Sequence, residues 1–485
     1  MTRYQELADD IEASITAGVL RAGDRLPSVR QTSERRGVSA STVFQAYYLL
    51  EARGLVRARE RSGYFVAQRP HSAPPEPTEP SSPEGDSFAV VDVSERVFEV
   101  LESAMDREVV PLGSAFPSPG LFPLRRLGQC LAHAAREADP RSAIDDLTPG
   151  SLALRRQIAR RYLADGLALT PADLVITNGA LEALNLSLAA VTRPGGAVVI
   201  ESPCFYGALQ ALERMGLSAI EVPTHPGEGM DLAALEAAVQ RHRPQAIWLM
   251  TCFQNPLGSL MPEARKRALV ELVTRHRVPL IEDDVYGELY FGERRPPPAK
   301  AFDTEGWVLH CSSFSKWLAP GWRTGWAAPG RFTRAVARQK LTTTLATNAP
   351  TQQALADYLE GGGADRHLRR LRQSLVLQRD HMASAIARHF PQGTRATRPE
   401  GGYFMWVQLP AHCDALALHR AALARGISVA PGPIFSASQA FGHCLRLNYG
   451  HDWSDETEQA LATLGTLARN APGQPPAASA APAVL

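Results

Sequence analysis

The sequence predicts a large domain built on an open α/β sheet, preceded by a small helical domain that ends in a β-hairpin. Three observations support this fold class. Short β-branched apolar runs alternate with amphipathic stretches over most of the chain. A proline-rich segment at residues 68–87 interrupts that pattern. The length of 485 residues also exceeds that of one ordinary domain.

The bulk composition excludes several classes of protein. An apolar fraction of 45% and a charged fraction of 21% are typical of soluble globular chains. No apolar run approaches the roughly 18 residues of a membrane span, and the N-terminus lacks the layout of a signal peptide. The six cysteines are scattered without a CxxC pair, which favours reduced thiols over disulfides or a zinc site. We therefore expect a cytoplasmic protein without a bound metal.

Two segments of low apolar content divide the chain. Residues 68–87 contain six prolines and almost no apolar side chains, which is typical of a semi-rigid linker. Residues 471–485 have the same character and are predicted to be disordered. Two folded units remain, at residues 1–67 and 88–470.

The first unit has the order helix, turn, helix and hairpin. Its first helix presents apolar residues at helical spacing. Ser28 precedes a second helix that Gly37 ends, and Ser39 is placed to cap a third. Two short strands, LVRAR and GYFVAQ, follow with a turn at Ser62 and Gly63. This order predicts a winged helix-turn-helix domain, in which the third helix enters the major groove of DNA.

The same unit resembles the GntR family of bacterial regulators, over nearly all of residues 2–67. The resemblance implies that the domain binds double-stranded DNA. The implied contact residues are Arg30, Ser39, Ser41 and Thr42 at the two helices, and Ser62 and Gly63 in the wing. Many members carry Arg where this chain has Ala40, and some carry Arg where it has Phe44. The nine arginines against four acids in residues 21–61 agree with a polyanion ligand, although a protein-binding helical domain is the alternative.

Polar residues follow the strands expected in the second unit. The expected strands are DLVIT, AVVIES, AIWLMT, VPLIEDD and WVLHCSS, each an apolar run that a turn ends. The polar residues that follow them include Asn178, Asn255, Asp283 and Lys316. In open α/β sheets, ligands bind at the carboxyl ends of the strands. We therefore expect these side chains to converge on one site.

The residue types at this edge suit pyridoxal phosphate. Lys316 is one of only four lysines in an arginine-rich chain, and lysine, unlike arginine, can form an imine with the cofactor. A carboxylate at Asp283 can keep the pyridine nitrogen protonated, and Tyr286 and Asn255 can reach the phenolate oxygen. Taken alone, Lys316 could be a surface charge and Asp283 a cap. The neighbouring Glu282 and Asp284 are rival acids.

Anion-binding groups complete the predicted site. The phosphate is expected at the start of the helix formed by Gly179, Ala180 and Leu181, with Ser313 and Arg323 beside it. One of two adjacent aromatics, Phe205 or Tyr206, is expected to cover the ring. Arg446 lies in an apolar, strand-like run and would need an anionic partner there. A ligand carboxylate would satisfy it, and a structural salt bridge is the alternative.

These motifs, in this order, resemble fold-type I aminotransferases of class I/II from about Phe116 to Tyr449. The resemblance implies that Lys316 is the imine lysine, Asp283 the pyridinium partner and Phe205 the stacking ring. It also implies that Asn255 and Tyr286 contact the phenolate oxygen and that Arg446 binds the substrate carboxylate. The residues that it implies for binding the phosphate are Gly179, Ala180, Leu181, Ser313 and Arg323. One departure concerns a tyrosine that relatives carry about five residues before Gly150. Here that stretch is Asp145-Asp146-Leu147-Thr148.

The two units together resemble the MocR/GabR group of transcriptional regulators. The resemblance implies a homodimer that senses an amino acid or amine through an external aldimine formed at Lys316, with a consequent change in DNA affinity. The alternative is an active aminotransferase that transfers an amino group from an amino acid to a 2-oxo acid, with Lys316 as the proton shuttle. A third interpretation, a large domain used only for dimerisation, does not explain why the lysine, acid and arginine are all present.

Overall fold

The structure is a computed structural model of the chain. The residues that it describes are 3–21, 23–52, 55–59, 63–66, 73–77, 87–103, 109–138, 141 and 147–470. The predicted tail at 471–485 lies outside them, as does most of the predicted linker.

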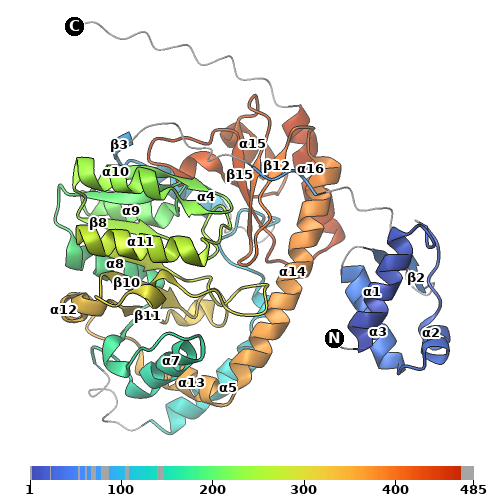
Figure 1. Ribbon diagram of the computed structural model, residues 1–485, viewed down its shortest axis with the longest axis horizontal. Coiled ribbons are helices and arrows are strands. Elements are labelled where there is room, and N and C mark those ends of the chain that lie inside the picture. Colours follow the sequence, from blue (N-terminus) through green and yellow to red (C-terminus); the bar gives the residue numbers. More distant parts are fainter. Residues whose placement is uncertain are drawn as a thin grey trace, which may run out of the picture.

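The small N-terminal domain, here called the head, comprises the described residues between 3 and 66 (Figure 1). Its elements are α1 (Arg3–Thr16), α2 (Val29–Arg36), α3 (Ala40–Ala52), β1 (Val56–Arg59) and β2 (Gly63–Val66). The two strands pair in antiparallel register from Val56↔Val66 to Arg59↔Gly63. The predicted order of helix, turn, helix and hairpin is confirmed.

The sequence signals for the ends of α2 and α3 act as expected. The Ser28 hydroxyl accepts from the Gln31 N–H in a capping box at the start of α2. Gly37 ends α2 in the left-handed conformation, at φ 63°. At the start of α3 the Ser39 hydroxyl accepts from the Thr42 N–H at 3.2 Å. The helices then bury a core of their own, which includes Leu7, Leu26, Val43, Ala46, Tyr47 and Leu50.

The large domain, residues 87–470, contains a nine-stranded sheet. Its strands are β3 (Ser87–Val90), β4 (Val175–Thr177), β5 (Ala197–Ser202), β6 (Ser218–His225), β7 (Gly229–Met230), β8 (Ala246–Leu249), β9 (Leu280–Asp283), β10 (Val308–Ser313) and β11 (Gly325–Ala328). The order is β3-β6-β5-β8-β9-β10-β11-β4, with β7 paired to β6. Strands β6, β5, β8, β9 and β10 are parallel, and β11 is antiparallel to both of its neighbours. All five strands expected from the sequence are present.

Both faces of this sheet are buried, as near-continuous apolar strands require. On one face Val198 and Ile200 of β5 pack in the same core as residues of α8 (Ala180–Val191) and α9 (Tyr206–Arg214). On the other face Val199 packs with residues of α10 (Leu232–His242) and α11 (Glu263–His276). The alternation along β5 therefore assigns each side chain to one of two cores.

A second, four-stranded sheet lies towards the C-terminus. It consists of β12 (Arg395–Ala396), β13 (Phe404–Gln408), β14 (Ala430–Pro431) and β15 (Cys444–Asn448), in the order β12-β13-β15-β14. The remaining α-helices of the described residues are α4 (Ser94–Ser103), α5 (Leu124–Arg136), α7 (Leu152–Ala164), α12 (Thr333–Thr343), α13 (Ala349–Glu360), α14 (Gly363–His389), α15 (Ala415–Leu423) and α16 (Asp455–Arg469). The long α14 runs along the side of the large domain on which the head lies (Figure 1).

Two features bear on the expected organisation of the chain. Ser87, the last residue of the predicted linker, is the first residue of β3, where it pairs with Glu221 of β6. Within the linker, residues 73–77 have no regular secondary structure, and the Pro75 carbonyl accepts from the Ala396 N–H at 3.1 Å. Among the helices that the structure describes, none has the length and apolar character needed to cross a membrane.

Candidate cofactor and effector site

A cavity opens at the carboxyl edge of the large sheet, where β4, β5, β8, β9 and β10 end. Its lining includes every residue predicted to hold the cofactor except Gly179: Phe205, Asn255, Asp283, Tyr286, Ser313, Lys316, Arg323, Ala180 and Leu181. Their positions span more than a hundred residues of sequence. The parallel strands bring them together because they all end at this edge.

Lys316 lies on the loop that follows β10. Its ammonium nitrogen donates to the Ala115 carbonyl at 2.9 Å and lies 4.0 Å from the centre of the Phe116 ring. The pKa of Lys316 is lowered from 10.5 to about 7, chiefly by burial and also by the positive charge of Arg446, against the opposing effect of Asp283. A large fraction of this amine is therefore neutral near pH 7, as a nucleophile must be.

Asp283 ends β9 and faces the same cavity. Burial raises its pKa from 3.8 to about 7, and the neighbouring charge of Asp284 contributes, while Lys316 opposes the shift. The Oδ1 atom is fully buried without a hydrogen-bond partner. Buried polar atoms are nearly always paired, so this oxygen fits a ligand that brings an N–H group. A protonated pyridine nitrogen supplies both the hydrogen and the positive charge.

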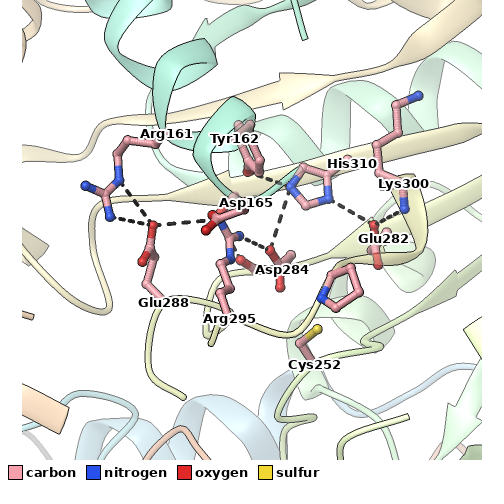
Figure 2. Close-up of polar contacts among 12 residues, drawn as sticks. Arg161, Tyr162, Asp165, Cys252, Glu282, Asp284, Glu288, Arg295, Lys300 and His310 are labelled. Atoms are coloured by element: carbon pink, nitrogen blue, oxygen red, sulfur yellow. Dashed lines mark hydrogen bonds and ion pairs between the residues drawn. The ribbon is translucent and has the colours of Figure 1, made fainter. Parts of the chain in front are cut away.

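The two rival acids do not line the cavity. They belong instead to a buried polar network (Figure 2). Glu282 accepts from the Thr251 hydroxyl at 2.6 Å and lies 2.9 Å from Nδ1 of His310. Asp284 accepts from Arg295 at 2.7 Å. These contacts hold both carboxylates in the polar network. Of the three consecutive acids, Asp283 is therefore the one that lines the cavity.

An anion cradle lies at the start of α8. Gly179 is its N-cap, at φ 88°, and a Cβ atom there would stand 2.5 Å from the Arg323 guanidinium. Glycine therefore allows Arg323 to approach the free N–H groups of the first helical turn. Arg323 also donates to the Ser315 hydroxyl at 3.3 Å, and the Ser315 N–H donates to the Ser313 hydroxyl. Helix N–H groups, two hydroxyls and a guanidinium at one place suit a phosphate dianion.

Ser315 is a residue that the sequence interpretation missed. It lines the cavity one residue before Lys316. The sequence does contain a second hydroxyl two residues after Ser313. The two-residue spacing alone, however, does not show that both side chains reach one ligand.

Tyr286 and Phe205 form part of the apolar wall. The Tyr286 ring lies edge-on to Tyr403 at 5.4 Å, and burial raises the pKa of Tyr286 above its ordinary value. Its phenol therefore stays protonated and can donate a hydrogen bond. Phe205 packs on Gly207, where a Cβ would lie 2.5 Å from the ring, and Tyr206 lines the cavity beside it. Both aromatic candidates thus reach the cavity.

Arg446 lies on β15, with none of its surface exposed. It donates to the carbonyls of Gly113 at 2.6 Å and Ser114 at 3.2 Å, and to Oδ1 of Asn255 at 3.2 Å. Its Nε atom has no partner. Within the described residues no carboxylate forms an ion pair with Arg446, so the structural salt bridge is not found there. The guanidinium is available to an anion that displaces the two carbonyls.

The segment 113–116 covers the site, and its role was not foreseen from the sequence. Lys316 and the Tyr403 hydroxyl both donate to the Ala115 carbonyl, and Arg446 donates to the two carbonyls before it. Asn448 donates to the Ser114 and Phe116 carbonyls. Backbone carbonyls of this segment therefore occupy the donors that a bound amino acid would use.

The predicted DNA-contacting residues lie on the head. Arg30, on α2, is 90% exposed in its side chain and pairs with Glu34 at 3.0 Å. The Ser39 hydroxyl lies 2.8 Å from the hydroxyls of Ser41 and Thr42 at the start of α3. Gly63 begins β2 at φ 94°, whereas Ser62 is outside the described residues.

Comparison with known proteins supports both halves. Residues 128–464 match the family described as aminotransferase class I and II, and residues 3–66 match the bacterial regulatory proteins of the gntR family. The chain belongs to the aminotransferase class I and II family. The match covers more than half of its length, and members of this fold-type I family depend on pyridoxal phosphate.

The similarity to one relative extends over both halves of the chain. An uncharacterized HTH-type transcriptional regulator of Escherichia coli (strain K12), YdcR, is 46% identical over 96% of this chain and 99% of its own length. The combination of a gntR-type head and an aminotransferase class I and II domain is therefore that of a group of HTH-type transcriptional regulators, as in the MocR/GabR type.

Two solved structures match the large domain. A multiple substrate aminotransferase from Thermococcus profundus has a TM-score of 0.72 and 28% identity, covering 78% of this chain and 96% of its own. LysN, an alpha-aminoadipate aminotransferase from Thermus thermophilus, has a TM-score of 0.68 and 30% identity, covering 78% and 98%. The latter was solved with N-(5'-phosphopyridoxyl)-L-leucine. Of the stretch 145–148, in which relatives were expected to carry a tyrosine, residues 145 and 146 lie outside the described part of the chain.

Proposed function

We propose that this chain is a pyridoxal phosphate-dependent transcriptional regulator that senses an amino acid or amine. The proposal rests on one observation: a head that matches the gntR family and a cavity lined by Lys316 and Asp283 occur in one chain, and the similarity to YdcR extends over both. We further propose that it works as a homodimer on operator DNA, which for a bacterial regulator lies in the cytoplasm.

Different residues at the cavity would bind different groups of the cofactor. Lys316 would supply the attaching amine, Asp283 would pair with the pyridine nitrogen, and Asn255 and Tyr286 would donate to the phenolate oxygen. The phosphate would be held by Gly179, Ala180, Leu181, Ser313 and Arg323, with Ser315 as an added donor, and Phe205 would cover the ring. Pyridoxal phosphate bound there supplies an electrophilic carbon that reacts with primary amines.

Effector binding acts through Arg446 and the segment 113–116. A ligand carboxylate forms two charge-assisted hydrogen bonds with Arg446, in place of the weaker bonds to the Gly113 and Ser114 carbonyls. The carbonyls of the segment 113–116 then lose their hydrogen bonds from Arg446, so the segment must move or accept hydrogen bonds from other donors. A ligand shifts DNA affinity only by its differential binding to two arrangements of the protein, and this exchange of partners provides such a difference.

An active aminotransferase is the second candidate. The likeness of the large domain to the Thermococcus profundus enzyme favours it, as does the pKa of Lys316 near 7, which suits proton transfer. The head has no part in such a reaction, so this candidate leaves the head's match to the gntR family unexplained.

The test measures absorbance and DNA binding on the same full-length preparation. Amino acids are titrated with and without a 2-oxo acid while DNA affinity is followed by fluorescence anisotropy. We expect a spectral change at the cofactor that saturates, and a shift of DNA affinity over the same concentration range. Rapid multiple turnover without DNA binding would overturn the regulator in favour of the enzyme.

Borohydride reduction tests the lysine. The reduced protein is digested and the modified peptide identified by mass spectrometry, and only four lysines compete. We expect the label on Lys316 and its loss in Lys316→Ala. A label on Lys266, Lys300 or Lys340 would contradict the assignment. These three already have partners in the structure, such as Asp303 for Lys300 and Glu182 for Lys340.

A further inference from the structure

The exposed face of α3 lacks charge, which is unusual for a surface that approaches DNA. Val43, Ala46, Tyr47 and Leu50 point into the core of the head. The opposite face presents Ala40, Ser41, Phe44, Gln45 and Tyr48. Phe44 is 54% exposed and Tyr48 is 64% exposed, one helical turn apart. Two neighbouring aromatic side chains exposed to solvent at this position indicate a ligand with an apolar surface.

The position of these side chains places them at base edges. In a helix-turn-helix domain the second helix of the motif enters the major groove, and its N-terminal residues contact the bases. Here that helix is α3, and Ser39 caps its start. Ala40, Ser41, Phe44 and Gln45 therefore occupy the first two turns, where base contacts are made.

The chemistry of the face selects a base pair. Thymine is the base whose major-groove edge carries a methyl group, and Ala and Phe side chains contact it. Gln forms two hydrogen bonds with adenine, whereas guanine is read by Arg or Lys. The first two turns of α3 contain neither Arg nor Lys. The exposed arginines Arg30, Arg35 and Arg36 lie on α2 instead, where they suit phosphates, which carry no base identity.

We propose that Phe44 is a specificity-determining residue that contacts a thymine methyl group, with Gln45 bonded to an adenine next to it. The operator half-site then has A·T pairs beneath the start of α3. This inference rests on the proposed DNA binding by the head and adds the class of sequence that the head reads.

An intramolecular partner is the competing occupant. A groove lies between α3 and α14, and its lining includes Phe44, Gln45, Tyr48, Val376 and Leu377. If that groove were the purpose of the aromatics, the head would dock on the large domain. The uncharged face, however, continues to Ala40 and Ser41, which do not line the groove. Docking on α14 does not account for the exposed, uncharged Ala40 and Ser41 at the start of the helix.

The experiment removes single methyl groups from the DNA. Operator fragments are selected from a random pool with the full-length, cofactor-loaded protein, and each thymine is then replaced in turn by deoxyuridine. We expect one or two positions in each half-site at which this replacement weakens binding about fourfold, the size of one buried methyl group. Phe44→Ala should bind the thymine fragment as weakly as the wild type binds the deoxyuridine fragment, and should not distinguish the two.

Val19→Ala serves as the matched control, because Val19 is an apolar residue of the head that is 74% exposed and lies outside α3. It should retain the full response to deoxyuridine. Selected sites that are rich in G·C beneath α3, or wild-type binding that is indifferent to deoxyuridine, would overturn the thymine contact but leave DNA binding intact. A Phe44→Ala variant that binds both fragments more tightly would also overturn it, in favour of docking on α14. Absence of binding to any fragment would instead sink the proposed DNA-binding function.

Discussion

Arg30 on α2 and Arg446 on β15 are both placed to bind an anion, yet their surroundings differ in almost every physical respect. The Arg30 side chain is 90% exposed, and it pairs with Glu34, an exposed neighbour on the same helix. Arg446 is completely buried, holds backbone carbonyls and stacks 4.1 Å from the Phe404 ring. Charge in water is screened by salt, whereas buried charge is governed by desolvation and geometry. The head should therefore respond chiefly to ionic strength, and the cavity to side-chain shape and pH.

Salt should produce the largest difference between the two regions. If the head makes about six phosphate contacts, raising salt from about 50 to 200 mM should weaken DNA binding by roughly 10³-fold, because bound counterions are released. Effector affinity, measured from the cofactor absorbance, should change only a few-fold over the same range, since Arg446 is shielded from solvent. Equal slopes for the two ligands would show that the contrast between the regions is wrong.

Arg446→Gln should lower the affinity for an amino acid effector by about a hundredfold, because two charge-assisted hydrogen bonds are lost. Spectral titration measures the loss. Arg446→Lys keeps the charge without the paired geometry and should fall between the two. An amine without a carboxylate should bind wild type and variant alike. DNA affinity without effector should not change, and a variant that loses both activities would place Arg446 among structural residues.

The pH dependence should reveal Asp283 in the cofactor-free protein. Its pKa is raised on folding from 3.8 to about 7, so its favourable contribution to stability is complete below pH 3.8 and is lost as the pH rises through about 7. Stability should therefore fall between about pH 4.5 and 6.5, by up to about 1.4 kcal/mol per pH unit for this group. Lys316 contributes little to the slope in this window, because its lowered pKa leaves it mostly protonated in both states.

Urea unfolding at several pH values gives the measurement, and Asp283→Asn is the control because it cannot ionise. The difference in stability between wild type and variant should change with pH in the cofactor-free protein. It should flatten when the cofactor is loaded, since a cationic ring favours the ionised carboxylate. Parallel pH profiles for the two cofactor-free proteins would contradict the burial argument.

The difference between the regions also explains what the sequence could predict. Residues that follow strand ends, such as Asp283 and Lys316, could be placed because parallel strands carry them to one edge. The covering segment 113–116 could not, since its contacts use backbone carbonyls, which every residue possesses. Strand β3 was hidden for a similar reason: its place beside β6 is set by tertiary pairing, and its four residues follow a proline-rich stretch. In the head, local signals decided nearly everything, because caps and turns act within a few residues.

The smallest expected effect tests those local signals. Helix α2 has only eight residues and depends on the Ser28 capping box. Ser28→Ala should destabilise it by about 1 kcal/mol. In the full-length protein, amide hydrogen exchange in α2 should then accelerate about fivefold, while amides of β9 and β10 exchange as before. Ser28→Asp retains a capping oxygen and should behave like wild type. Faster exchange throughout the large domain would mean that the two regions unfold together, which their separate cores argue against.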